Sequence, residues 1–79
     1  MGGGIENGVY IHNKSGKLYE VIGTALHTET DEKLVVYKPL YSSEYNMFVR
    51  PLGMFVEQIL INGLKVQRFT KQENEWKSS

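Results

Sequence analysis

A chain of 79 residues is long enough for one small domain, and without cysteine it has no disulfide bond or thiolate ligand to supplement a thin core. Nine Lys and Arg residues balance nine Asp and Glu residues, so the basic excess typical of a duplex-DNA binder is missing. Two histidines argue against structural zinc, and no apolar run reaches transmembrane length, so we expect a cytoplasmic protein with no metal, cofactor or membrane contact.

Both ends of the chain are polar. Residues 1–7 are rich in glycine, and residues 70–79 are polar apart from Trp76. Because such segments bury too little apolar surface to offset their ordering entropy, we expect flexible ends around one β domain of residues 8–69. Trp76 is the one candidate anchor for the C-terminal tail.

The first expected strand covers residues 8–12 and alternates with a period of two. Val9 and Ile11 share one face, while Tyr10 and His12 share the other. Burial of the aliphatic pair predicts that Tyr10 and His12 point away from the core.

A turn with glycine at position 16 follows this strand. A three-residue turn with a glycine bulge would place Ile11 opposite Tyr19, with both side chains inward. A slip by one residue would bring Glu20 inside, so burial favours the bulged turn.

The second expected strand is long, covering residues 17–28, with Gly23 near its middle. Tyr19 and Val21 fit the inner face before this glycine, and Leu26 fits it afterwards. A change of phase at glycine predicts a bend, as at the corner of a barrel.

The third expected strand covers residues 33–41 and is apolar on both faces. One face carries Leu34, Val36 and Leu40, and the other carries Val35, Tyr37 and Tyr41. We assign the aliphatic face to the core. Because the opposite face is also apolar, one of the two must be covered or used for binding.

The remaining elements are short. A strand at 45–50 ends at Pro51, because proline lacks the N–H that a ladder needs. Residues 53–58 predict one helical turn, Asn62-Gly63 a tight turn, and 66–70 a last strand. The fold class is therefore all-β, with about five strands and one short helical turn. Its form is a small SH3-like barrel or a strongly curved antiparallel sheet. The predicted core comprises Val9, Ile11, Tyr19, Val21, Leu34, Val36, Val49, Phe55 and Phe69.

Several short motifs recur in one order between residues 8 and 69. They are Gly8-Val9-Tyr10-Ile11-His12, His27-Thr28-Glu29-Thr30, Val35-Val36-Tyr37-Lys38-Pro39-Leu40-Tyr41, Val49-Arg50-Pro51-Leu52-Gly53-Met54-Phe55 and Arg68-Phe69. This ordered set resembles the small bacterial domain-of-unknown-function 1653 family. The family's pattern Gly-x-Tyr-x-His-x-Lys-Gly is met here with Ser15 inserted before Gly16. The resemblance implies a small β domain and carries no activity with it.

Six residues are candidates for ligand binding because alternation places them opposite the predicted core. They are Tyr10, His12, Tyr37, Tyr41, Arg50 and Arg68. Two guanidinium groups can clamp a carboxylate or phosphate, and aromatic rows can stack bases or hold peptides. The alternative is structural: the arginines pair with Glu20, Glu29 or Glu57, and the aromatic residues form a minor core.

No nucleophile–base constellation or phosphate-binding glycine motif is present, so we predict no catalytic residue and no enzyme. The favoured function is a binding module for a peptide, a small anionic ligand or a single-stranded nucleic acid. The alternative is a structural or assembly domain that associates through an apolar strand face. We expect a monomer or a weak homodimer.

Overall fold

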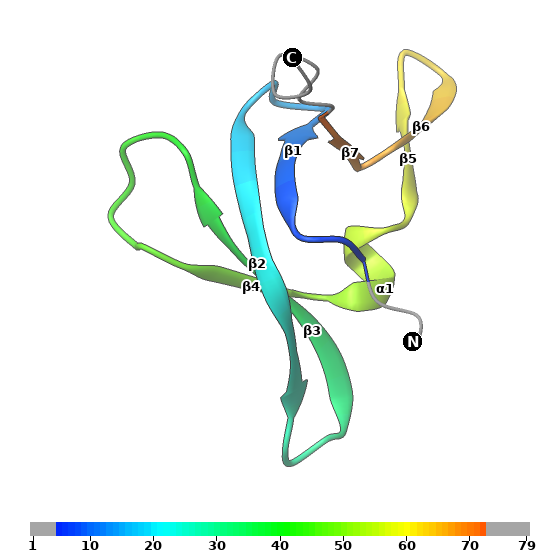
Figure 1. The fold of residues 1–79 in the computed structure, drawn as a ribbon. Coiled ribbons are helices and arrows are strands. Elements are labelled where there is room, and N and C mark those ends of the chain that lie inside the picture. Colours follow the sequence, from blue (N-terminus) through cyan, green and yellow to red (C-terminus); the bar gives the residue numbers. More distant parts are fainter. Residues whose placement is uncertain (1–4, 73–79) are drawn as a thin grey trace, which may run out of the picture.

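The computed structural model describes residues 5–72, so Trp76, the candidate anchor, and most of the tail that was expected to be flexible lie outside the described residues. Five antiparallel strands form one curved sheet in the order β4-β3-β2-β1-β7 (Figure 1). The strands are β1 (Gly8–His12), β2 (Leu18–His27), β3 (Glu32–Pro39), β4 (Phe48–Pro51) and β7 (Phe69–Lys71). A separate hairpin consists of β5 (Gln58–Ile61) and β6 (Leu64–Gln67), and α1 (Leu52–Phe55) is the one short helix of this region.

The mainly β fold class is confirmed, and the sheet is open. The two edge strands, β4 and β7, exchange no ladder hydrogen bonds, so the sheet is not closed into a barrel. Of the two predicted forms, the curved antiparallel sheet is the one observed. Among residues 5–72, no helix combines the length and the hydropathy that a membrane span needs.

The turn between β1 and β2 has four residues, one more than expected. The N–H of Gly16 donates to the carbonyl of His12 at 2.7 Å, and the N–H of His12 donates to the carbonyl of Lys17 at 2.8 Å. Gly16 has a φ of 77°, which glycine adopts without strain. The additional residue shifts the register, so Tyr10 lies opposite Tyr19 instead of Ile11.

This shift reverses the two faces of β1, because side chains alternate with a period of two. Tyr10 is buried with 8% of its surface exposed, whereas Val9 and Ile11 are half-buried. The prediction that Val9 and Ile11 face the core and Tyr10 and His12 face away is therefore wrong. The outer position of Glu20, opposite Val9, leaves its carboxylate near the ammonium of Lys38 at 3.8 Å.

The faces of β3 and β4 are reversed in the same way. Val35 is fully buried and Tyr37 is 4% exposed, whereas Leu34 and Val36 are half-buried. On β4, Val49 is 59% exposed. The assignments of Leu34, Val36 and Val49 to the core are wrong, because the aromatic face fills the interior.

The bend near Gly23 is confirmed. The pairing of β2 with β3 shifts between Val21 and Gly23, which leaves Ile22 as a bulged residue. Beyond the bulge, Leu26 follows the phase of the inner face, opposite Lys33. Its side chain is nevertheless 54% exposed, because this end of the β2–β3 hairpin projects past the core (Figure 1).

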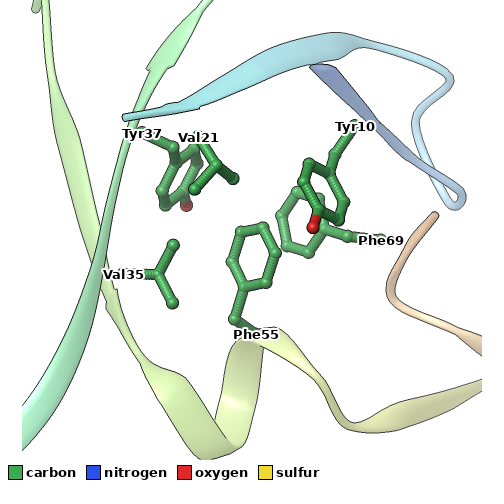
Figure 2. Packing of buried hydrophobic residues seen from close by; sticks show 6 residues of the cluster. All are labelled: Tyr10, Val21, Val35, Tyr37, Phe55 and Phe69. Atoms are coloured by element: carbon green, nitrogen blue, oxygen red, sulfur yellow. The ribbon is translucent and has the colours of Figure 1, made fainter. Parts of the chain in front are cut away.

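The core is largely aromatic and is organised around Phe55, which α1 points into the sheet (Figure 2). The Phe55 ring stacks on Phe69 with centroids 4.0 Å apart, and it meets Tyr10 and Tyr37 edge-on at 5.6 and 5.4 Å. Val21 and Val35 complete the buried cluster, and half-buried Ile5, Tyr19, Phe48 and Leu52 pack against it. The predicted burial of Val21, Phe55 and Phe69 is confirmed.

The second half of the chain follows its turn signals. Pro51 ends β4 as predicted, and the helical turn begins at Leu52. Asn62 and Gly63 have φ values of 53° and 80°, which is the positive-φ pair of a type I′ turn. This turn was predicted, and it joins β5, which was not predicted, to β6. The prediction of one last strand at 66–70 is wrong, because Arg68 separates β6 from β7 and the two strands belong to different sheets.

Candidate functional site

Two of the candidate residues, Tyr10 and Tyr37, belong to the core. The hydroxyl of Tyr10 donates to the carbonyl of Glu6 at 2.9 Å, and its ring packs on Phe55. Burial and the nearby Glu6 carboxylate raise the pKa of Tyr10. The ring of Tyr37 lies in the core, and its hydroxyl accepts a hydrogen bond from Arg50.

Arg50 occupies the inner face of β4, contrary to its predicted position opposite the core. Its Nε donates to the hydroxyl of Tyr37 at 3.3 Å, and its Cζ lies 5.7 Å from the centre of the Phe69 ring. No carboxylate within residues 5–72 forms an ion pair with this guanidinium. Arg50 is half-buried, so it is a partly desolvated cation held by aromatic groups alone.

Arg68 follows the structural alternative in part. Its Nη2 forms an ion pair with the Glu57 carboxylate, and its side chain is only 21% exposed. Its Nε is buried and has no hydrogen-bond partner. A buried donor without an acceptor costs free energy, so the ion pair with Glu57 satisfies this guanidinium only in part.

His12 ends β1 opposite Phe69 of β7 and is close enough to both arginines to feel their charge. Its ring centroid is 4.9 Å from that of Phe69, and its Nδ1 is 2.8 Å from the Ser15 hydroxyl. Burial lowers the pKa of His12, and the positive charges of Arg50, Arg68 and, more weakly, Lys14 lower it further. The ring is therefore neutral at pH 7.

Tyr41 reaches the same region through Tyr19, a residue that the sequence analysis placed in the core. The two hydroxyls are 2.9 Å apart, and the rings meet edge-on at 5.5 Å. Burial raises the pKa of Tyr19, and the hydrogen bond with Tyr41 raises it further. The ammonium of Lys17 lies 4.6 Å from the centre of the Tyr41 ring, which adds another positive charge.

We call this arrangement the Phe69 cluster. Three of its members, His12, Tyr19 and Arg50, lie against the ring of Phe69. Tyr41 joins them through its contact with Tyr19, and Arg68 precedes Phe69 in the chain and acts on His12 through its charge. The grouping of His12 with both arginines is as hypothesised, although on the inner side of the sheet. Tyr19 and Phe69 were missed as site residues, and adjacency of Phe69 to Arg68 was the one signal in the sequence.

The Phe69 cluster is rich in hydrogen-bond donors. Guanidinium groups donate only, neutral histidine keeps one N–H, and one hydroxyl of the hydrogen-bonded Tyr19–Tyr41 pair keeps its hydrogen. Within residues 5–72, no three His, Asp or Glu side chains gather closely enough to share a metal ion. Among residues 5–72, Glu57 is the one acidic group that forms an ion pair with a member of the cluster.

Two surface hollows lie beside the cluster. One of about 240 Å³ shares Phe69 and Tyr10 with the core and is bordered by Lys71. The other, of about 440 Å³, lies between the β5–β6 hairpin and Asn13, and Leu64 is among its apolar lining residues. Neither of these two hollows is lined by His12 or Arg50.

Comparison with known proteins agrees with the resemblance seen in the motifs. The family model described as "Protein of unknown function (DUF1653)" matches residues 8–71. This chain belongs to the DUF1653 family. The crystal structure of a protein belonging to DUF1653 from Bordetella bronchiseptica is similar to it, with 35% sequence identity and a TM-score of 0.80. The match covers 86% of this chain and 87% of that one. No curated protein matches this DUF1653 chain.

Proposed function

We propose that this DUF1653 domain is a non-catalytic binding module that holds a small anionic group at the Phe69 cluster. The observation that carries the proposal is the state of Arg50. Its guanidinium is half-buried over Phe69 and has no carboxylate partner among residues 5–72. An arginine that is partly removed from water and left without a counter-charge binds an anion more favourably than an exposed one.

The packing of the tyrosines favours a small anion over a single-stranded nucleic acid or a peptide. Tyr19 meets Tyr37, Tyr41 and Phe69 edge-on, with centroids 5.4–5.9 Å apart. Base stacking needs exposed ring faces, and proline-rich peptides need an aromatic groove. Here the rings pack edge-on against one another, so the cations and the hydrogen-bond donors supply the recognition of the ligand.

Anion-dependent thermal stability tests this proposal. Phosphate or acetate, compared with chloride at equal ionic strength, should raise the Tm of the parent protein, because ligand binding to the folded state stabilises it. Arg50→Gln should abolish that rise. Lys38→Gln, which removes the same charge from the outer face, should keep it. If the parent shows no anion effect, or if both variants lose it equally, the proposal is wrong.

A second candidate function is self-association, and one observation supports it. The outer face of the sheet exposes Val49 and Ile22 beside half-buried Val36, so apolar surface remains on the side away from the core. Tyr37 is buried within its own protomer, so an assembly would use this outer face instead. Sedimentation velocity at two concentrations tests the idea: association should appear at the higher concentration and disappear in Val49→Lys. A monomer at both concentrations would exclude it.

A further inference from the structure

The Ser15 hydroxyl is arranged to serve His12 in both of its protonation states. The N–H of Lys17 donates to Ser15 Oγ at 3.3 Å, which leaves the hydroxyl hydrogen free. While His12 is neutral, that hydrogen is available for Nδ1 at 2.8 Å, and the ring carries its own hydrogen on Nε2. When His12 is protonated, Nδ1 donates instead, and the second lone pair of the hydroxyl accepts. Proton uptake therefore costs His12 no hydrogen bond.

The charges that face His12 come from every element around it. Lys14 belongs to its own turn, Arg50 to β4 and Arg68 to the link between β6 and β7, and all three disfavour the protonated ring. The Tyr19 ring of β2 lies 6.4 Å away and is uncharged. A dianion bound among these cations would offset their positive charge and favour the protonated imidazole. Anion binding and protonation of His12 should therefore favour each other, because linkage is reciprocal.

The number and origin of the donors distinguish between classes of anion. A carboxylate is planar, and a single guanidinium can satisfy both of its oxygens. The Phe69 cluster instead offers His12 from β1, Arg50 from β4 and one hydroxyl of the hydrogen-bonded Tyr19–Tyr41 pair, so its donors come from three separate segments of the chain. Donors from three directions suit a tetrahedral group with three free oxygens. A phosphate monoester also carries the charge of nearly two that is needed to offset the cations.

We propose that the anionic group recognised by the Phe69 cluster is a phosphate monoester, and that His12 gains a proton as this group binds. This inference rests on the proposed function of the cluster as an anion site. It assigns the ligand class and makes the affinity of the site depend on pH.

NMR titration of the two histidine rings tests the proposal on the full chain. Spectra are recorded from pH 5 to pH 8.5 in chloride, inorganic phosphate, sulfate and acetate at equal ionic strength. Phosphate and sulfate should move the titration midpoint of His12 upward by about one pH unit, because an opposite charge nearby favours the charged ring. Acetate should move it much less. His27, in the exposed end of the β2–β3 hairpin, is the internal control and should respond to no anion.

Two variants separate the parts of the inference. Arg50→Gln should remove the phosphate effect on His12. Ser15→Ala should weaken proton uptake while phosphate still binds at pH 8. Phenyl phosphate compared with inorganic phosphate then decides the source of the group: tighter binding of the ester indicates a phosphate carried on a flat organic molecule.

The outcomes distinguish this inference from the function on which it rests. If phosphate shifts the resonances of the cluster but leaves the His12 midpoint unchanged, the proton linkage is wrong and anion binding remains. If acetate binds as tightly as phosphate, the assignment to phosphate is wrong. If no anion moves any resonance of the cluster, the proposed function itself fails. An upward shift of His12 and not of His27, lost in Arg50→Gln, supports the inference.

Discussion

Val35 and Val36 are adjacent residues of the same type on opposite faces of β3, so truncating each to alanine tests the register of the whole sheet. Val35 is fully buried between the sheet and α1, whereas Val36 is half-buried on the outer face beside Val49. Both substitutions reduce β propensity equally. The difference between the two variants therefore reports burial alone.

The expected cost follows from the removed groups. Deleting two buried methyl groups from Val35 forfeits about 1.6 kcal/mol of transfer free energy. A residual cavity of about 50 Å³ adds about 1.2 kcal/mol, so Val35→Ala should lose about 3 kcal/mol. For Val36→Ala we expect less than about 1 kcal/mol, because its site is already partly hydrated. In a domain of this size, about 3 kcal/mol lowers the Tm by roughly 12–24 °C.

Urea and thermal unfolding followed by circular dichroism measure both variants. The parent supplies the reference slope, and an unchanged urea slope shows that stability alone has changed. A larger loss for Val36→Ala than for Val35→Ala would refute the aromatic-in register and restore the aliphatic-in one. Equal losses would mean that β3 is buried on both faces, as in an assembly.

Three further predictions concern the core, the ion pair and pH. Phe55→Ala should lose about 3–5 kcal/mol, because it removes the one buried side chain of α1; a melting temperature equal to that of the parent would contradict this. Glu57→Gln should cost about 1 kcal/mol in urea unfolding, since it leaves the partly buried Arg68 without its carboxylate. The lowered pKa of His12 predicts a contribution to stability that is complete above about pH 6.5 and is lost as the pH falls toward the folded-state pKa, because only the unfolded chain takes up the proton in that window. Urea midpoints at pH 5 and pH 7.5 should therefore lie closer together in His12→Gln than in the parent.

The sequence predicted the strands and turns that depend on local chemistry. Pro51 ends β4, Gly23 adjoins the bulge in β2, and Asn62-Gly63 forms the tight turn. Each of these follows from the backbone limits of one or two residues. Such limits act without tertiary contacts, so they are readable in the chain.

The inner and outer faces could not be assigned in this way. Alternation correctly grouped Tyr10 with His12, but it is symmetric and does not say which group is buried. The assignment of the buried face depended on the length of the turn between β1 and β2. That turn, which contains Ser15, is one residue longer than expected. Preference for Val9 and Ile11 over aromatic residues reversed the prediction for β1, and the same preference for aliphatic residues reversed it for β3 and β4, whereas Val21 of β2 was correctly placed inside.

Several residues of the candidate site could be named from the sequence, but their position in the fold could not be predicted. Alternation grouped His12, Arg50 and Arg68 with Tyr10 opposite the predicted core, but whether they converge depends on the curvature that brings β4 toward β7. Pairing of Arg68 with Glu57 and the isolation of Arg50 depend on contacts across that curve. Such contacts between distant segments leave no local pattern in the sequence.

The β5–β6 hairpin leaves and rejoins the domain between Glu57 and Arg68, and its last residue is also held by Asn13, whose Nδ2 donates to the carbonyl of Gln67 at 2.7 Å. The N–H of Arg68 donates to the carbonyl of Glu57 at 3.0 Å, and the side chains of the same two residues form an ion pair. The ten residues between them, 58–67, begin and end side by side, and their departure would leave both Phe55 and Phe69 in place. The length and the sequence of this segment can therefore change at little entropic cost to the closed loop. Relatives of this domain should differ most in length here, and a foreign peptide grafted between Glu57 and Arg68 should be displayed without disturbing the remainder of the fold.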